Sequence, residues 1–166
     1  CGEGGGGKLL GSMPSEDQKV LVGILTNTAW YPFEVADRLD RAIVDVLGGG
    51  RTEVFQDIGR ASAKANLGGV HKGMLTPSDP QAFMKKADMI YRFYYDVGRR
   101  EYEATGPTSG VLTTDGAETY STADCATVIG WYLEALTMCG AKSPRIVAEE
   151  CRARGGKVCR YRVSWS

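Results

Sequence analysis

The chain has no excess of charge of either sign. Twenty Lys and Arg residues balance twenty Asp and Glu residues, and the sequence pI is about 6.8. A protein that binds nucleic acid or an anionic membrane over a broad surface needs an excess of Lys and Arg. The sequence also lacks a run of about 20 apolar residues, the length that a membrane-spanning helix requires. We therefore expect no nucleic-acid partner and no membrane span.

Histidine is almost absent, because His71 is the only one in the chain. The sequence also contains no nucleophile–histidine–acid set, no paired-carboxylate motif and no credible phosphate loop, so we predict that the protein is not an enzyme. A haem-binding protein needs an axial ligand to the iron. A single histidine between Gly-rich turns is more typical of a surface residue, and we do not expect haem.

Cysteine is present, but not in the pattern of a disulfide scaffold. Five cysteines are an odd number, and a chain of 166 residues does not need disulfides to fold. This indicates a reduced, cytoplasmic protein. One alternative starts from Cys1, because a mature bacterial lipoprotein begins with Cys and a flexible tether, and "CGEGGGGK" suits that pattern. Nothing after this segment resembles a secreted protein.

The length predicts a single domain over residues 1–166. It consists of a Gly-rich segment at 1–13, a helical part at 14–97, and strands, a long helix and a terminal hairpin at 98–166. Helical spacing predicts helices over about 15–25, 32–47, 52–66 and 123–138, and a further one that starts at 79–80. Strands are expected at about 100–105, 110–115, 145–153 and 157–165. This order predicts an α+β fold, with helices packed on a small antiparallel sheet.

The terminal hairpin contains the sequence "EECRARGGKVC" at residues 149–159. Alternation places Cys159, Tyr161 and Val163 on one face of the last strand and two arginines on the other. A loop of odd length pairs Cys151 with Cys159 and points both thiols toward the apolar side, with Gly155 or Gly156 left-handed. A two-residue turn would instead place Cys151 among the arginines. Burial of the thiols favours the odd loop.

Several segments of the chain resemble a family of uncharacterised, mainly myxobacterial proteins. They are "MPSED", "WYPFEVADRLDRAI", "DIGRASA", "YYDVGRREYE" and the tail "CATVIGWYLEALTMCGAK…EECRARGGKVCRYRVSW". Residues 120–165 are also similar to the 4-vinyl-reductase-type ligand-binding domain. Its superfamily includes haem–nitric-oxide sensor domains and vesicle-tethering TRAPP subunits. The resemblance implies the fold of that superfamily, with a further N-terminal strand that is missing here.

The resemblance also implies a metal site. Aromatic-sensing activators with the 4-vinyl-reductase-type domain hold zinc through a Cys, a Glu-x-x-Cys and a second Cys after seven residues. Cys125, Cys151 and Cys159 match the cysteine positions, whereas Ala148 stands where the glutamate is expected. Glu149 follows it and has the inward parity in the predicted hairpin, so it is our candidate for the fourth ligand. Three thiolates and a carboxylate close a structural zinc site.

Two other uses of these thiols stay open: buried free cysteines that only pack, and a disulfide. Cys139, near the end of the long helix, is interpreted as a core residue. The Tyr-x-Ser-x-Arg clamp with which the nitric-oxide sensors hold haem carboxylates is not found in this sequence.

Aromatic residues give the remaining signal. The candidates for an apolar ligand pocket are Trp30, Tyr91, Tyr94, Tyr95 and Trp131. The alternative is that they form the ordinary core. Asp96, Arg99 and Arg100 lie beside this cluster; they would orient a carboxylate, or they form a solvated helix end.

Two functions are therefore carried forward. The first is a non-enzymatic sensory domain for a small hydrophobic molecule, with zinc or packed thiols anchoring the pocket wall. The second is a protein-interaction module, as the TRAPP resemblance implies, which acts as a homodimer or binds a protein partner. Because a fold hosts many functions, the resemblance supports the fold better than either function.

Overall fold

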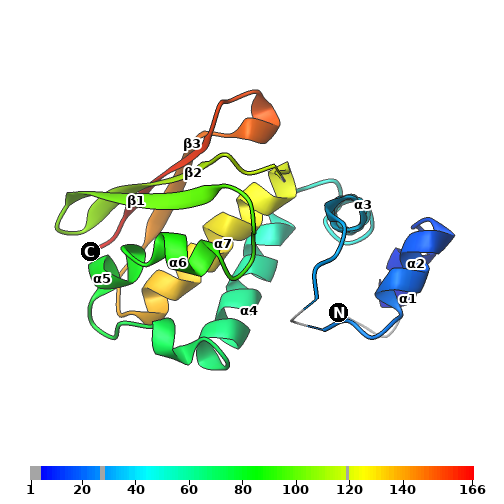
Figure 1. Cartoon of the computed structure of the whole chain (residues 1–166), viewed down its shortest axis with the longest axis horizontal. Coiled ribbons are helices and arrows are strands. Elements are labelled where there is room, and N and C mark those ends of the chain that lie inside the picture. The colour runs from blue at the N-terminus through cyan, green and yellow to red at the C-terminus, as the bar shows by residue number, and fades with distance from the viewer. Residues whose placement is uncertain (1–4, 27–28, 119) are drawn as a thin grey trace. The chain divides into compact units, whose positions relative to one another are not determined.

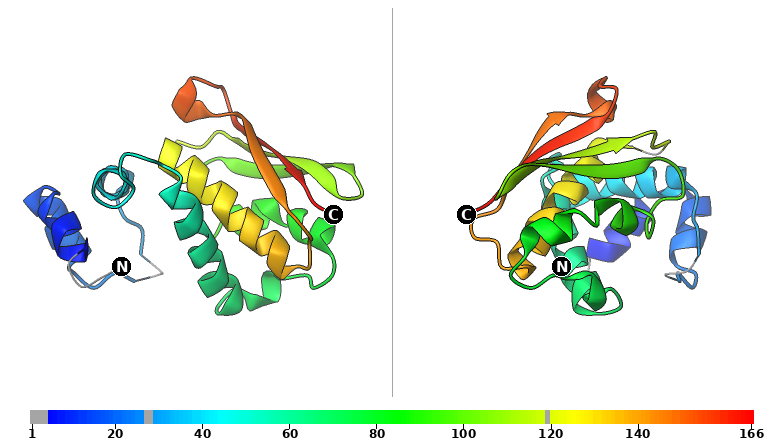
Figure 2. Two further views of the ribbon diagram at one scale, coloured as in Figure 1. Left: turned by 180° about the vertical axis from the view of Figure 1, so that it is seen from behind. Right: turned by 60° about the vertical axis from the view of Figure 1, so that its left-hand side comes forward.

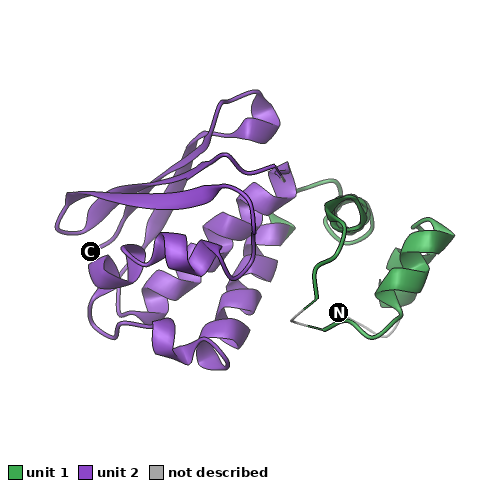
Figure 3. Cartoon of the chain, in the orientation of Figure 1, with its two compact units in different colours: residues 1–54 green, residues 55–166 purple. Residues whose placement is uncertain are grey.

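The computed structural model describes residues 5–26, 29–118 and 120–166. The chain divides into two compact units, residues 1–54 and residues 55–166 (Figure 3). Cys1, and with it the lipoprotein interpretation, lies outside the described residues. None of the described helices is long and apolar enough to cross a membrane.

The first unit contains the helices α1 (Gly5–Gly11), α2 (Ser15–Leu21) and α3 (Phe33–Val46). Helix α1 lies in the Gly-rich segment, where no helix was expected. Asp17 of α2 is only 2% exposed, and its two carboxylate oxygens accept hydrogen bonds from Arg38 of α3 at 2.6 and 2.8 Å. The Arg38 guanidinium holds the pKa of Asp17 below its usual value. This pair joins α2 to α3.

The second unit is built around a four-stranded sheet (Figure 1). Its strands are β1 (Arg99–Gly106), β2 (Ser109–Asp115), β3 (Arg145–Glu150) and β4 (Cys159–Ser164). Their spatial order is β1-β2-β4-β3, and every neighbouring pair is antiparallel. The predicted α+β fold with a small antiparallel sheet is confirmed.

Helices cover one face of this sheet (Figures 1 and 2). They are α4 (Val54–Gly68), α5 (Pro80–Met84), α6 (Ala87–Tyr91) and α7 (Thr122–Met138), with the short 3-10 turn η1 (Lys72–Met74). A second 3-10 turn, η2 (Arg152–Arg154), lies in the loop between β3 and β4. The helix expected from residue 79 onward is split, because the chain leaves the helical path at Lys85 and Lys86. The core lies between α7 and the inner face of the sheet.

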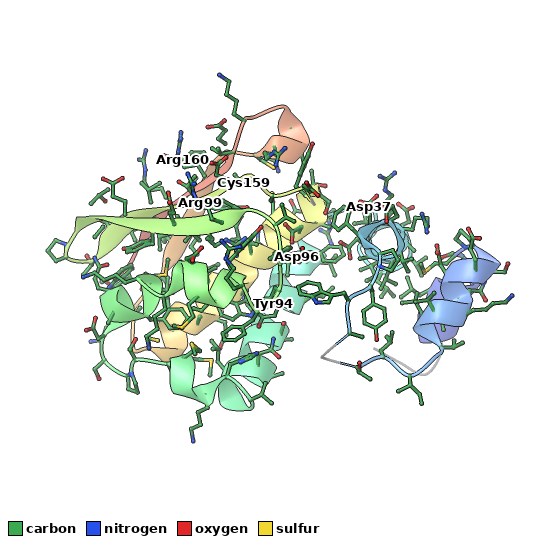
Figure 4. All side chains as sticks on the ribbon, viewed as in Figure 1. Asp37, Tyr94, Asp96, Arg99, Cys159 and Arg160 are labelled. Atoms are coloured by element: carbon green, nitrogen blue, oxygen red, sulfur yellow. The ribbon has the colours of Figure 1, made fainter. Side chains whose placement is uncertain are left out.

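Strand β4 shows why the sheet has a helix-covered face and an open face. Cys159, Tyr161 and Val163 are buried, whereas Arg160 and Arg162 are exposed. Side chains of a strand alternate between its two faces, so this pattern directs the apolar set toward α7. Arg99 and Arg160 project from the opposite face (Figure 4).

Helices α4 and α7 touch through two glycines. A Cβ atom added to Gly59 would collide with the Thr127 carbonyl oxygen, and one added to Gly130 would collide with the Gln56 carbonyl oxygen. The two backbones are therefore in direct contact, which only glycine permits at these positions. This contact fixes the position of α7, which carries residues of both candidate sites described next.

Candidate functional site

Three cysteines from distant parts of the second unit form one buried cluster. Cys125 lies in the first turn of α7, Cys151 follows β3 directly, and Cys159 begins β4. The Cys125 Sγ atom lies 3.1 Å from that of Cys151 and 3.6 Å from that of Cys159. All three sulfur atoms lie within 4.8 Å of one another, and each residue is 5–6% exposed. The cluster thus joins α7 to the terminal hairpin.

The hairpin loop spans residues 151–158, and the last pair of the β3–β4 ladder is Glu150 with Arg160, so the predicted pairing of Cys151 with Cys159 is not part of the sheet. Gly155 is left-handed, with a φ of 88°, as one of the two glycines was expected to be. Gly156 donates its N–H to the Cys151 carbonyl at 3.0 Å, and a Cβ on Gly156 would lie 2.7 Å from Glu150 Cγ. The prediction that Cys151 and Cys159 both point to the apolar side is confirmed.

Hydrogen bonds within the cluster make the Cys159 thiol more acidic than the Cys125 thiol. The Cys125 thiol and the backbone N–H of Arg152, at 3.4 Å, donate to the Cys159 sulfur. These bonds lower the pKa of the Cys159 thiol to about 6, and the bond to Cys159, together with burial, raises the pKa of Cys125. The thiolate is the form that binds a metal ion. Of these two thiols, Cys159 therefore loses its proton more readily and is the one better prepared to bind a metal ion.

The inward orientation predicted for Glu149 is wrong. Ala148 pairs with Tyr161 and Glu150 with Arg160, so Glu149 is an extra residue in a β-bulge. Its carboxylate forms an ion pair with Arg162 on the open face of the sheet. Within the described residues, the group of potential ligand atoms contains the three thiols alone.

Cys139 also lies outside the cluster. It is fully buried at the end of α7, where its carbonyl accepts a hydrogen bond from Ser78. Its interpretation as a core residue is confirmed.

A second candidate site is a pocket in the second unit, a cavity of about 100 Å³ that is partly open to solvent. It is lined by Ser62, Ile90, Tyr94, Tyr95, Arg100, Asp124, Thr127, Val128, Trp131 and Tyr132. The structure thus brings together three of the predicted pocket residues, Tyr94, Tyr95 and Trp131. Tyr94 is labelled in Figure 4, below the sheet.

Two predicted residues do not line this pocket. Tyr91 is buried behind Tyr95: their rings stack with centroids 4.7 Å apart, and the Tyr91 hydroxyl donates to the Val97 carbonyl at 2.7 Å. Trp30 belongs to the first unit and is 66% exposed. All lining residues lie between 62 and 132, in the second unit.

The pocket also contains charged groups. The Tyr95 hydroxyl donates to Asp124 Oδ1 at 2.5 Å. Burial raises the pKa of Tyr95 well above its usual value, and it also raises the pKa of Asp124. Arg100 is 6% exposed and donates from Nε to Thr114 Oγ1 at 2.8 Å. Sequence reasoning considered Arg100 only as one of three charges and did not expect its burial.

Two buried polar atoms in the pocket make no hydrogen bond of standard geometry with the described residues, although each has a polar neighbour, Tyr94 for Trp131 and Arg100 for Tyr132. They are Trp131 Nε1 and the Tyr132 hydroxyl. Most buried polar groups in proteins are hydrogen-bonded, so each such exception calls for an explanation. Two exceptions in neighbouring residues of one pocket indicate a capacity to bind a ligand. Tyr132 was not among the predicted pocket residues, although it follows Trp131 directly.

The sequence pattern of a family described as "Protein of unknown function (DUF2378)" matches residues 27–166. The chain belongs to this family. The DUF2378 match contains the pocket and the three clustered cysteines, and it leaves out α1 and α2. Comparison with curated proteins gives no match.

Solved structures show which fold this DUF2378 chain has. An Fe(II) unliganded H-NOX protein from K. algicida is 12% identical, with a TM-score of 0.75, covering 99% of this chain and 88% of that one. An Fe(II)NO H-NOX protein from S. oneidensis is 12% identical, with a TM-score of 0.71 and coverages of 100% and 91%. An H-NOX variant from T. Tengcongensis is 10% identical, with a TM-score of 0.67 and coverages of 91% and 85%. The fold is H-NOX-like.

The residues of this DUF2378 chain do not fit a haem iron. The single histidine, His71, is not a pocket residue, and its ring stacks on Phe93 with centroids 4.6 Å apart. Tyrosine is a known haem ligand, but Tyr95 donates its proton to Asp124, and its raised pKa disfavours the phenolate. Tyr94 accepts a hydrogen bond from Asn66 at 3.0 Å, and burial raises its pKa as well.

Proposed function

We propose that the second unit of this DUF2378 chain is a sensory domain that binds a small, mostly apolar molecule. The observation that carries the proposal is the pocket walled by Tyr94, Tyr95, Trp131 and Tyr132. Aromatic walls supply apolar contact area, and a few polar groups fix the orientation of a ligand. The S. oneidensis relative is described in an Fe(II)NO state, so the same fold holds a ligand in that protein.

The domain, in this proposal, catalyses no reaction. The pocket lining contains two aliphatic hydroxyl groups, those of Ser62 and Thr127. No imidazole lines the pocket that could activate either hydroxyl as a nucleophile. Asp124 is held by the Tyr95 hydroxyl, which donates to it instead of taking part in a proton relay to a nucleophile. These contacts suit a binding site whose polar groups are fixed in place.

The thiol cluster is part of the proposal as a structural zinc site. Zinc binds thiolates at about 2.3 Å in tetrahedral geometry, which places two bound sulfur atoms about 3.8 Å apart. The spacing of Cys125 Sγ to the other two sulfurs, 3.1 and 3.6 Å, is close to that value. The metal would tie the first turn of α7 to the hairpin. Its fourth donor is not Glu149, which is paired with Arg162.

Several finer assignments belong to the same proposal. We place the chain in the 4-vinyl-reductase and TRAPP-like superfamily and in its mainly myxobacterial family, because the spacing of Cys125, Cys151 and Cys159 matches that domain. A cytoplasmic location is supported by the four described cysteines, which are all free. Free thiols are typical of a reducing compartment.

Native mass spectrometry of protein purified without added metal tests the proposal. We expect a mass increment of one zinc ion, and an organic adduct that is lost in the pocket variant Trp131→Ala. The variant Val147→Ala is the control, because Val147 is an exposed residue of β3 in the same unit and does not line the pocket, and it should keep the adduct. A protein that carries no adduct, and whose melting temperature does not respond to a panel of small apolar compounds, would overturn the sensory function.

The alternative function is a protein-interaction module that forms a homodimer. It is favoured by exposed apolar side chains in the first unit, where Ile24 is 92% and Val22 69% exposed. Such side chains are costly to leave in water when they form a contiguous patch. Light scattering after size-exclusion chromatography should then show a dimer that Ile24→Asp dissociates. A protein that stays monomeric over a 100-fold range of protein concentration would count against this alternative.

A further inference from the structure

We infer that the ligand of the pocket carries a carboxylate, which is received by Arg100, Trp131 Nε1 and the Tyr132 hydroxyl. The ligand class is thus a small aromatic acid. This inference rests on the proposed function, because it specifies the molecule that the same pocket binds.

Arg100 is a buried cation that is near enough to the Asp124 carboxylate to attract it but forms no contact ion pair with a described carboxylate. Its exposure is 6%, and no described carboxylate lies within 4.0 Å of its guanidinium nitrogens. The neighbouring Arg99, in contrast, is exposed and is paired with both Glu101 and Asp115. A buried charge is costly unless it is paired and hydrogen-bonded. The same strand therefore has one arginine for the surface and one that faces the pocket.

Most of the donor capacity of Arg100 is available to a ligand. A guanidinium has five N–H donors, and Arg100 uses Nε for Thr114 at 2.8 Å. The guanidinium carbon lies 5.0 Å from the Tyr91 ring centroid and 5.7 Å from that of Tyr132, so two aromatic faces hold it in place. A guanidinium fixed in this way matches the planar, two-oxygen geometry of a carboxylate.

The two unpaired donors specify the same chemistry. An indole N–H donates and cannot accept, so Trp131 Nε1 requires an acceptor from the ligand. The ring centroids of Trp131 and Tyr132 lie 5.1 Å apart, and both residues line the pocket with Arg100. An oxyanion provides acceptors to all three groups at once. A ligand with a donor group would leave the Trp131 donor unpaired.

Asp124 lies in the same pocket, but its charge already has partners. Its Oδ1 accepts from the Tyr95 hydroxyl, and it lies in the first turn of α7, where the helix dipole favours an anion. A ligand carboxylate is repelled by Asp124 and attracted by Arg100. This fixes the direction in which the acid enters, with its apolar ring toward Tyr94 and Tyr95.

Isothermal titration with benzoate and with nitrobenzene, its neutral counterpart of the same shape, tests the inference. We expect the wild-type protein to bind benzoate about tenfold or more tightly than nitrobenzene, the size of effect that one charged hydrogen bond gives. Arg100→Gln should abolish this preference. Arg99→Gln is the matched control and should retain it, because Arg99 is exposed.

A second variant separates binding from folding. Tyr132→Phe removes a hydroxyl that has no described partner, so the melting temperature should not fall, whereas benzoate affinity should fall severalfold. If Arg100→Gln does not fold, this variant decides the question: unchanged benzoate affinity overturns the inference. Equal binding of benzoate and nitrobenzene overturns the inference and leaves the proposed function standing. Binding of neither compound is evidence against the proposed function itself.

Discussion

Asp124 and Cys125 are consecutive residues in the first turn of α7, and they belong to two different sites. Asp124 lines the aromatic pocket and accepts a hydrogen bond from Tyr95. Cys125 forms the thiol cluster with Cys151 and Cys159. Because one helical turn carries both side chains, an ion bound by the thiols would also fix the position of the pocket carboxylate.

The first prediction concerns the thiols. Cys151→Ser should remove the zinc increment from the native mass spectrum and lower the free energy of unfolding by more than about 2 kcal/mol, because metal binding contributes to folding. Cys139→Ser is the matched control, since Cys139 is also buried but lies outside the cluster, and it should keep the metal. Equal metal content in both variants would contradict the site.

The second prediction concerns Glu149. Glu149→Gln should leave the metal content unchanged and alter the free energy of unfolding by less than about 1 kcal/mol, because it removes only a surface ion pair with Arg162. Metal content by mass spectrometry and urea unfolding measure the two effects. Loss of the metal in this variant would show that Glu149 reaches the thiols after all.

The third prediction concerns the contact of α4 with α7. Gly59→Ala and Gly130→Ala should each lower the free energy of unfolding by about 1–3 kcal/mol or more, because the added methyl group meets backbone atoms that cannot rotate away. Gly68→Ala, at the open end of α4, is the control and should be neutral or stabilising. Urea unfolding of the three variants checks this order.

The fourth prediction concerns pH and the first unit. Because Arg38 lowers the pKa of Asp17 below its usual 3.8, the pair stabilises the folded state above that pH. This stability is lost as the pH falls through the folded pKa. A carbon-13 NMR titration should show Asp17 titrating below 3.8, and Arg38→Gln should move it upward.

Arg41→Gln is the control for this titration, because Arg41 pairs with Asp37 in an exposed contact of α3. It should leave the Asp17 midpoint where it is. An Asp17 midpoint at its usual value in the wild-type protein would contradict the predicted effect of Arg38.

The terminal hairpin shows how far the sequence could predict the site. Alternation along β4 and the need to bury thiols were enough to point Cys151 and Cys159 to the same buried side, because both arguments depend on local geometry. The same counting placed Glu149 inward, because it assumed that every residue of β3 has a partner. A β-bulge inserts an unpaired residue and reverses the parity beyond it, and no local signal marked the bulge.

The pocket was predicted in part for a similar reason. Tyr94, Tyr95 and Trp131 were found by aromatic clustering, but such clustering carries no information on which unit a residue belongs to, and it also included Trp30 of the first unit. The burial of Arg100 could have been predicted from the sequence, because Arg100 and Tyr102 are two residues apart on the predicted strand and therefore lie on the same face. It was treated as a helix end because charged residues are rarely buried.

The glycine contact between α4 and α7 has a consequence for how a molecule enters the pocket. Ser62 lies on one of these helices and Thr127 on the other, and the two backbones touch without intervening side chains. These helices cannot separate without losing that contact, so they form the stationary wall. Admission then depends on the segment that carries Tyr94, a residue 37% exposed. Within the second unit, we expect the stretch between α6 and β1 to be the part of the pocket wall that moves when a ligand enters.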